Sequence, residues 1–415
     1  MTAIAVGAAS TEARTPRAAA AAQRWYIITC EYPPLVGGVS DHTLLLVRAL
    51  TEAGDSVDLW CPPAGEDDGA APDVPGATVH VLPSRFGIDA LRALRRVLRE
   101  VPAGTRVLVQ WVPTAFGWRM MNLPFALLLF ARRGRMLELY VHEVGWEISS
   151  RETIRRALAG VVQRVMTWLA ARSARRVLVT IPAWGQRLHL LGVSALAKEQ
   201  TVTWAPVPSN LPDRADAARV AEIRRGMLHG TRQRVIVGHF GTLSRYHATL
   251  MPHVVTRILD EGSDRIVLLV GRGGTTLRES ILAARPDLAS RLTATGSLSP
   301  DEASAHIAAC DLLVQPYEDG VSARRGSLMA GLALGRPTIT NRGSNTEDVW
   351  ALERAVHLTD TAAPHAFATA VTKLMADAAL RERLSVASAR LHAERFALAR
   401  GVALLREDDA SMERV

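Results

Sequence analysis

Short apolar runs alternate along the chain with stretches whose apolar residues recur at helical spacing. After residue 23, the apolar runs lie at Arg24–Cys30, 56–62, Val79–Leu82, Arg106–Trp111, Met136–His142 and Arg176–Ile181. Helical stretches, many rich in arginine and leucine, lie between several of these runs. Strands that alternate with helices are typical of a parallel sheet. The first half of the chain is therefore predicted to be an α/β unit.

The same alternation begins again after residues 201–213, which are rich in proline and polar residues and are interpreted as a linker. The second set of predicted strands is Arg234–Phe240, Arg265–Val270, Leu292–Thr295, Leu312–Gln315 and Thr338–Thr340. A chain of 415 residues is long for one core and sufficient for two. We predict a disordered tail over residues 1–23, a Rossmann-like domain over 24–205, a second one over 206–380, and a helix over 381–415 that packs back on the first domain.

The net charge of the chain indicates which partners it binds and does not alter the predicted fold. Hydrophobic residues make up 48% of the chain and charged residues 22%, which is a globular composition. The formal net charge of +8 favours anionic partners such as a nucleotide, a phosphate or an acidic membrane surface. No helix-turn-helix, zinc-finger or aromatic–basic RNA motif accompanies the charge, so we expect no nucleic-acid partner.

Cysteine usage and hydropathy bear on the compartment. The three cysteines, Cys30, Cys61 and Cys310, are widely spaced and form neither a metal-ligand pattern nor a disulfide framework. The first residues lack the continuous apolar segment of a secretion signal. The longest apolar run, Leu123–Ala131, is much shorter than the ~20 residues that span a bilayer. We expect a soluble, cytoplasmic protein and leave open a peripheral contact with the inner face of the membrane.

Ligands of open parallel sheets bind beyond the carboxyl ends of the strands, so candidate chemistry is sought there. Gly37 and Gly38 precede a helix, and their loop could bring backbone N–H groups against a phosphate or could simply be a tight turn. His142, followed by Glu143, ends a buried strand, and it could contact a sugar hydroxyl or be a structural histidine.

Glycine and charge patterns mark two further strand ends. The run Gly271–Gly274 lacks the third glycine of a dinucleotide fingerprint, which disfavours an oxidoreductase and leaves a glycine-lined nucleotide pocket open. In the segment Gln315–Thr340, Asp319 precedes a helix that starts near Arg325–Ser327. The free N–H groups of that helix, with Arg324 or Arg325, suit a diphosphate, and the alternative is a capped helix with solvated arginines.

Aromatic and basic residues leave further alternatives open. Tryptophans at the strand ends, Trp111 and Trp184 among them, could stack on sugar rings or belong to the core. The basic helix over 151–176 could meet anionic lipid headgroups, although a solvated arginine face is the favoured interpretation.

An ordered series of motifs resembles the retaining glycosyltransferases of family 4, and it extends over roughly residues 24–405. It consists of YPPLVGGVSDHTLLLVRALTEAGDSVDLW, VHEVGW, WAPVPSNLP, GHFGTLSRYHATL, LLVGRGG, TATGSLSPDEASAHIAACDLLVQPYEDGVSARRGSLMAGLALGRPTIT and LHAERFALARGVALL. The resemblance implies a GT-B fold with an acceptor-binding first domain and a second domain that binds a nucleoside-diphosphate sugar. It also implies transfer with retention at the anomeric carbon and no required metal or other cofactor.

The chain departs from the family pattern at the diphosphate and ribose positions. Where the family carries an arginine and a lysine after the first strand of the second domain, this chain has Thr242 and His247, with Arg245 between them. The paired glutamates of the family correspond to Asp319 and Ser327, and a serine does not hold a ribose as a carboxylate does.

The resemblance assigns roles to individual residues. Arg245 offsets leaving-group charge, Asp319 positions the donor sugar, and His142 contacts that sugar from the other domain. The predicted donor-binding set is Gly37, Gly38, Gly241, Thr242, His247, Gly271, Gly273, Ser297, Tyr317, Arg324, Arg325, Gly326 and Ser327. The acceptor is a small molecule, a glycan or a lipid-linked compound. The alternative is a catalytically inactive GT-B protein that binds nucleotide or glycan as a partner of an active transferase.

Overall fold

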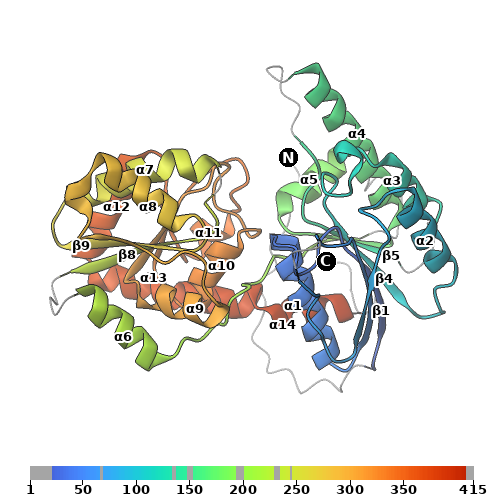
Figure 1. Ribbon diagram of the computed structural model, residues 1–415, viewed down its shortest axis with the longest axis horizontal. Coiled ribbons are helices and arrows are strands. Elements are labelled where there is room, and N and C mark those ends of the chain that lie inside the picture. Colours follow the sequence, from blue (N-terminus) through green and yellow to red (C-terminus); the bar gives the residue numbers. More distant parts are fainter. Residues whose placement is uncertain are drawn as a thin grey trace.

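The computed structural model describes residues 21–65, 69–132, 137–146, 153–192, 201–228, 234–243 and 245–407. Figure 1 shows two lobes, each built on a sheet with helices on both faces. All strand pairs in both sheets are parallel, which agrees with the strand–helix alternation of the sequence.

The first sheet has seven strands in the order β3-β2-β1-β4-β5-β6-β7. Its central strands β4 (Arg106–Trp111) and β5 (Leu137–Val141) are buried along their whole length, as expected where helices cover both faces. The other elements of this lobe are β1 (Arg24–Ile28), α1 (Gly38–Glu52), β2 (Ser56–Cys61), β3 (Ala77–Val81), α2 (Ile88–Arg99), α3 (Leu123–Phe130), α4 (Ile154–Ser173), β6 (Arg176–Val179), α5 (Pro182–Leu190) and β7 (Thr201–Trp204).

The second sheet has six strands in the order β10-β9-β8-β11-β12-β13. Its strands are β8 (Val235–Phe240), β9 (Arg265–Val270), β10 (Leu292–Ala294), β11 (Leu312–Gln315), β12 (Thr338–Asn341) and β13 (His357–Thr359). Its helices are α6 (Ala217–Leu228), α7 (Arg245–Asp260), α8 (Gly274–Ala284), α9 (Pro300–Ala309), α10 (Gly326–Ala333), α11 (Val349–Leu352) and α12 (Pro364–Ala376).

Two strands and one helix break differ from the sequence prediction. Residues 201–204, predicted as part of a linker, form β7 at the edge of the first sheet beside β6. β13, a strand of three residues, was not predicted at all. In place of the single helix predicted over 381–415, the described residues form α13 (Ala378–Leu391), a π-helical turn η3 (His392–Phe396) and α14 (Leu398–Arg406). Short edge strands carry too little hydrophobic pattern to be recognised without their sheet neighbours.

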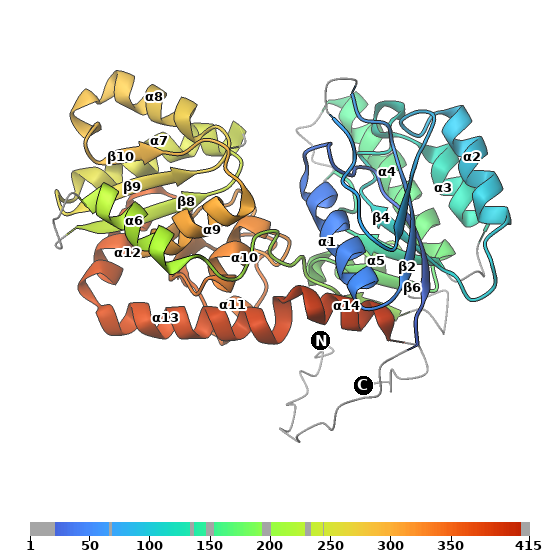
Figure 2. The same ribbon diagram turned by 60° about the horizontal axis from the view of Figure 1, so that its bottom comes forward.

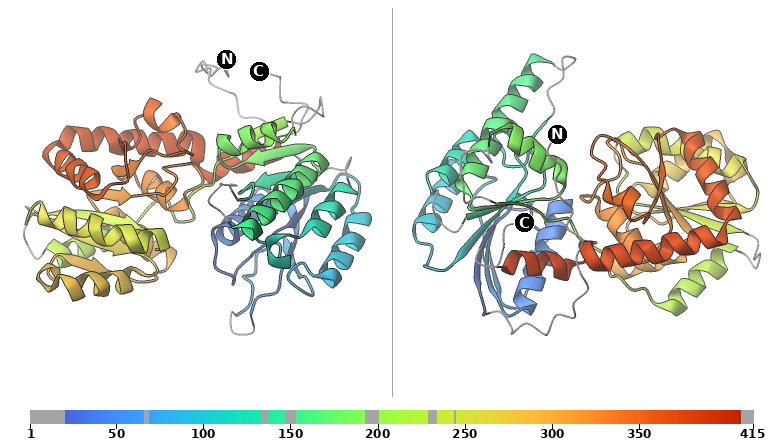
Figure 3. Two further views of the ribbon diagram at one scale, coloured as in Figure 1. Left: turned by 90° about the horizontal axis from the view of Figure 1, so that it is seen from above. Right: turned by 180° about the vertical axis from the view of Figure 1, so that it is seen from behind.

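The C-terminal helices connect the two lobes. α13 packs against α10 and α12 of the second lobe, whereas α14 packs against α1 of the first. Figures 2 and 3 show this crossing as one continuous band along the molecule. Among the described helices, none is both long enough and apolar enough to cross a membrane.

A buried charge triad holds α14 on the first sheet. Glu138 of β5, fully buried, accepts from Nε of Arg106 at 2.6 Å and from Nη2 of Arg176 at 2.6 Å. Arg176 also donates to the backbone carbonyls of Leu404 at 3.0 Å and Leu405 at 2.8 Å. Those carbonyls are in the last turn of α14, where no helical N–H remains to pair with them. The triad therefore links the middle of the first sheet to the end of the chain.

We predict that Glu138→Gln lowers the free energy of unfolding by ~3–5 kcal/mol, because two buried guanidinium groups then lose the one carboxylate that pairs with them among the described residues. Urea unfolding followed by circular dichroism measures the change. The matched control is Asp287→Asn, which removes one carboxylate from an exposed pair with Arg285 and should change stability little. Equal changes in the free energy of unfolding for the two substitutions would show that the buried triad contributes no more to stability than an exposed ion pair.

Candidate functional site

The carboxyl ends of the strands of both sheets face a cleft between the lobes, and two cavities lie along it. The first, of about 370 Å³, is lined from the first lobe by Glu31, Gly37, Gly38, His142 and Glu143, and from the second by Arg324 and Gly326. The second, of about 340 Å³, is lined from the second lobe by Gly241, Thr242, Gly271, Arg272 and Ser297, and from the first by Asp41 and Arg48. Asn210, after β7, lines both.

The N-terminus of α1 is already occupied by a carboxylate. Glu31 Oε1 accepts from the backbone N–H groups of Val39 at 2.9 Å and Ser40 at 3.0 Å. A Cβ atom at Gly37 would collide with this carboxylate, whereas one at Gly38 would meet nothing. The first glycine is therefore needed for the approach of Glu31. Backbone N–H groups at the start of α1, which were expected to meet a phosphate, therefore donate to Glu31 instead. The glycine pattern of the sequence did not predict this contact.

His142 is held as a neutral imidazole at the end of β5. Only 8% of it is exposed, and its Nε2 lies 2.6 Å from Oε1 of Gln110. Its ring stacks on Tyr140 at 5.0 Å and meets the edge of His42 at 5.0 Å. Burial, reinforced by His42, holds the pKa of His142 well below its ordinary value. With Nε2–H donated to Gln110, Nδ1 is left as a hydrogen-bond acceptor.

Glu143 is a cavity-lining carboxyl to which sequence reasoning assigned no role. Burial raises its pKa, while Arg324 and a hydrogen bond with Thr114 act in the opposite direction. The neighbouring Glu31 also raises it. The first-lobe wall of the cavity thus carries three carboxyl groups, those of Glu31, Asp41 and Glu143, and the second-lobe wall opposite carries Arg324.

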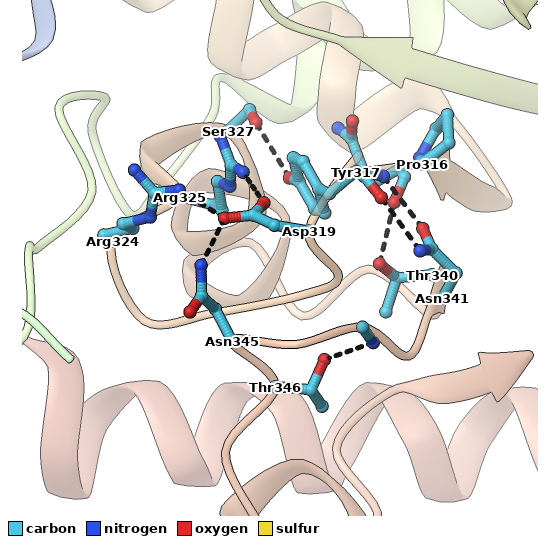
Figure 4. Close-up of polar contacts among 12 residues, drawn as sticks. Pro316, Tyr317, Asp319, Arg324, Arg325, Ser327, Thr340, Asn341, Asn345 and Thr346 are labelled. Carbon is cyan, nitrogen blue, oxygen red and sulfur yellow. Dashed lines mark hydrogen bonds and ion pairs between the residues drawn. The ribbon is translucent and has the colours of Figure 1, made fainter. Parts of the chain in front are cut away.

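Asp319 holds the two neighbouring arginines Arg324 and Arg325 in place, as Figure 4 shows. Its two carboxylate oxygens form ion pairs with Arg324 and Arg325, and one of them also accepts from Nδ2 of Asn345 at 2.6 Å. Burial alone would raise the pKa of Asp319, but Arg325 and Arg324 bring it below the ordinary value. The carboxylate that was predicted to position a sugar therefore fixes two cations in this structure.

The first turn of α10 is a second anion-binding feature beside those arginines. Arg325 is its N-cap residue and makes no side-chain capping bond, in contrast to the N-terminus of α1. Ser327 exchanges a hydrogen bond of 2.9 Å with the hydroxyl of Tyr317, and the guanidinium of Arg325 lies 4.9 Å from the centre of the Tyr317 ring. Uncapped N–H groups and the helix dipole favour an anion at Gly326 and Ser327.

Glu347, unnoticed in the sequence, supports the loop that carries the arginines. Its Oε1 accepts from the backbone N–H of Ala323 at 2.9 Å, and its Oε2 from Nε1 of Trp350 at 2.6 Å. Burial raises the pKa of Glu347 to about 7, against an ordinary value of 4.5. No local motif marks this residue, because its partners come from the preceding loop and from α11.

Two glycines let the loops of the second cavity approach each other. Gly241 has φ +148° and Gly271 has φ +116°, and a Cβ at Gly271 would lie 2.7 Å from the carbonyl oxygen of Gly241. Gly273, with φ +83°, precedes α8. His247 contacts the carbonyl of Pro316 at 3.1 Å through Nε2, and burial lowers its pKa.

The side chain of Arg245, predicted as a catalytic cation, lies outside the described residues. Apart from Gly273, which precedes α8, and His247, which contacts Pro316, the other predicted residues divide between three places. Gly37, Gly38, His142, Arg324 and Gly326 line the first cavity, Gly241, Thr242, Gly271 and Ser297 line the second, and Asp319, Arg325, Tyr317 and Ser327 form the polar cluster at the start of α10.

The tryptophans Trp111 and Trp184 belong to the core. Trp111 is fully buried and donates to Oγ1 of Thr167 at 3.1 Å, so the alternative of sugar stacking is wrong for it. Trp184, 5% exposed, donates to the carbonyl of His142 at 2.8 Å and so supports the strand end. The guanidinium of Arg324 lies 5.5 Å from its ring centre, a contact between the lobes.

A family model matches one part of the chain, and solved structures match its fold. Residues 234–377 match the family model described as Glycosyl transferases group 1. That segment contains the second sheet and the Asp319 cluster, but it is less than half of the chain. No curated protein matches the sequence.

Solved structures match over nearly the whole chain. Sucrose-phosphate synthase from Thermosynechococcus elongatus is 17% identical, with a TM-score of 0.70 over 92% of this chain and 97% of that one. HepE of Anabaena, solved with UDP and glucose, is 15% identical, with a TM-score of 0.65 over 94% and 100%. WaaG, a glycosyltransferase involved in lipopolysaccharide biosynthesis, is 14% identical, with a TM-score of 0.62 over 92% and 98%. At these identities the likeness shows the fold, and the prediction of a GT-B fold is confirmed.

Glu347 predicts a pH dependence of stability. Because its pKa is higher in the folded state than in the unfolded state, the unfolded chain loses this proton first, and stability falls as pH rises from about 4.5 to about 7. The fall attributable to this group should be about 2–3 kcal/mol. We expect Glu347→Gln to flatten the slope measured by urea unfolding between pH 5 and pH 8. The exposed Glu394→Gln serves as the control, and an unchanged slope in both variants would contradict the assignment.

Proposed function

We propose that this protein is a glycosyltransferase that moves a sugar from a nucleoside-diphosphate sugar to an acceptor with retention at the anomeric carbon. The observation that carries the proposal is the arrangement across the first cavity. Arg324 and the uncapped start of α10 lie on the second-lobe wall, and His142 and Glu143 lie opposite. α10 falls within the segment that matches the group 1 model. The matching HepE structure was solved with UDP and glucose.

In the proposed complex, the diphosphate lies at the N-terminus of α10. Arg324 and Arg325 offset the charge that develops on the leaving group as the bond from the anomeric carbon to the phosphate oxygen breaks. Both arginines are presented by Asp319, so the diphosphate shares them with this carboxylate. The proposal requires no metal ion.

His142 contacts the donor sugar from the first lobe. As a neutral imidazole with Nε2–H committed to Gln110, it accepts a hydrogen bond from a sugar hydroxyl through Nδ1. The acceptor oxygen bonds to the anomeric carbon on the face that the diphosphate leaves, and the acceptor proton passes to the departing phosphate oxygen. The acceptor is a small molecule, a glycan or a lipid-linked compound.

A second candidate function is a GT-B protein that binds nucleotide or glycan without catalysis. Two observations favour it: Asp319 has its oxygens committed to arginines and Asn345, and Ser327 is committed to Tyr317. Hydrolysis or transfer of a bound donor by the pure protein separates the two functions. Nucleotide binding without any turnover across a broad set of acceptors would favour the second.

We predict that one nucleoside diphosphate among UDP, GDP, TDP and ADP, or its sugar conjugate, raises the melting temperature of the protein, because a ligand of the folded state stabilises it by mass action. Arg324→Gln should weaken the responding ligand by about tenfold or more, since a charge-assisted contact to phosphate is lost. Arg342→Gln is the matched control, because Arg342 is an exposed arginine of the same lobe. If no ligand shifts the transition, the donor assignment fails.

His142→Ala separates sugar contact from nucleotide binding. We expect transfer to fall by at least about tenfold, the value of one lost hydrogen bond to the reacting sugar, with the affinity for the nucleoside diphosphate unchanged. Steady-state kinetics and isothermal titration with the nucleotide provide the two readouts, and the exposed His253→Ala is the control. Loss of nucleotide affinity in His142→Ala would place this residue elsewhere in the complex.

A further inference from the structure

Helix α4 has an unusual charge composition for a surface helix of a globular domain. Its 20 residues, Ile154–Ser173, include four arginines and no aspartate or glutamate. Most surface helices mix the two signs, and like charges without counterparts on the same helix repel one another. The composition points to an anionic surface as the neighbour of this helix.

α4 also exposes an apolar stripe. The exposed fractions are 90% for Ile154, 59% for Leu158, 48% for Val161 and 43% for Val165. At about 100° per residue, these four side chains fall within about 60° of arc, so they form one continuous line along the helix. The opposite face is buried against the lobe by Gln163, Met166 and Ala170, among others, and α3 packs on this helix.

Arginines border the stripe on both sides. Arg155 and Arg164, both exposed, fall about 80–100° to either side of the line through Ile154 and Leu158. An apolar line flanked by cations is the pattern of a helix that lies in a membrane interface, with its apolar side chains among the acyl chains and its cations among phosphate headgroups. The favoured sequence interpretation, a solvated arginine face, does not account for four exposed aliphatic side chains in a row.

We propose that α4 is a docking surface for a membrane that contains anionic lipids. A second copy of the chain does not fit as well, because a two-fold contact through α4 would bring two sets of arginines together without carboxylates on either helix. An anionic bilayer offers acyl chains to the aliphatic stripe and phosphate headgroups to the arginines on both sides of it. The arginines each contribute to the attraction, and the aliphatic side chains contribute through burial.

The position of α4 connects this surface to the cleft. α4 follows β5 in the chain, and His142 and Glu143, which come directly after β5, line the first cavity. Figures 1 and 3 show its N-terminal half projecting beyond the rest of the lobe. Docking by this half holds the carboxyl edge of the first sheet close to the lipid surface. Where the proposed glycosyl transfer holds, this favours an acceptor carried by a lipid.

Vesicle co-sedimentation tests the proposal with the full chain. The vesicles are phosphatidylcholine alone, or an equal mixture of phosphatidylcholine and phosphatidylglycerol. We expect binding to the mixed vesicles, weak binding to the neutral ones, and a loss of binding on raising the salt concentration. The double variant Ile154→Ser/Leu158→Ser should bind the mixed vesicles about tenfold or more weakly. Arg155→Gln/Arg164→Gln should bind them roughly 10- to 30-fold more weakly.

The control variant is Leu352→Ser/Val386→Ser, which removes two aliphatic side chains that are 74% and 59% exposed on the second lobe. It should bind as the unmodified protein does. Melting temperatures of all variants establish that each is folded. Equal binding by all variants, or equal binding to neutral and anionic vesicles, would overturn the proposal. So would a dimer in sedimentation velocity that only the Ile154→Ser/Leu158→Ser substitutions dissociate.

The nucleotide thermal-shift assay keeps this result separate from the proposed function. The α4 variants should retain the response to the nucleoside diphosphate, because none of the substituted residues lines either cavity of the cleft. Vesicle binding without any nucleotide response would leave the membrane surface standing and remove the glycosyl-transfer proposal. Nucleotide response without vesicle binding would do the reverse.

Discussion

The buried contact of Glu138 with Arg106 and Arg176 is the interaction on which the geometry of the molecule rests. Two guanidinium groups cannot remain inside the first sheet without a carboxylate between them. Once held there, Arg176 supplies the donors that close the last turn of α14. α14 is the end of a chain that has already passed along the second lobe as α13, so the triad ties the second lobe to the first. The cleft and its two cavities exist because the two sheets are joined in this way as well as through the segment after β7.

Inside the cleft, anionic side chains occupy positions that suit a ligand anion. Glu31 satisfies the first N–H groups of α1, and Asp319 gathers Arg324 and Arg325. The start of α10, beside those arginines, has no such cap. These contacts pair partly buried charges within the chain. A diphosphate that binds in the cleft must therefore compete with Glu31 for the N–H groups of α1, and with Asp319 for Arg324 and Arg325.

Charge is distributed unevenly between the cleft and the outside of the molecule. The first-lobe wall of the first cavity carries Glu31 and Glu143, while α4, which starts after the same strand end, carries arginines and no acid. A net charge of +8 spread evenly would say little about partners. On α4, however, the positive charge is concentrated beside a line of exposed aliphatic side chains, a combination that suits an anionic membrane surface.

The sequence by itself determined the architecture and the location of the chemistry. Helical and strand periodicities are local properties, so they predicted two parallel α/β units, the order of most strands, and the strand ends where Gly37, His142 and Arg324 line a cavity. The ordered motifs predicted the GT-B fold. Elements with a weak local pattern were not predicted. β7 was interpreted as part of a linker, and neither β13 nor the π-helical turn between α13 and α14 was predicted.

Only the tertiary structure decided the partner of each polar group. Glu138 meets Arg106 across 32 positions and Arg176 across 38, and Arg176 meets α14 across more than 200. Glu31 at α1, Glu347 beneath the arginine loop and the burial of Trp111 depend likewise on residues brought together from different elements. A side chain takes its role from the groups that surround it, and burial and charge pairing arise only when the elements pack. For this reason the periodicity of the chain identified the elements, while the packing of the two lobes assigned the contacts.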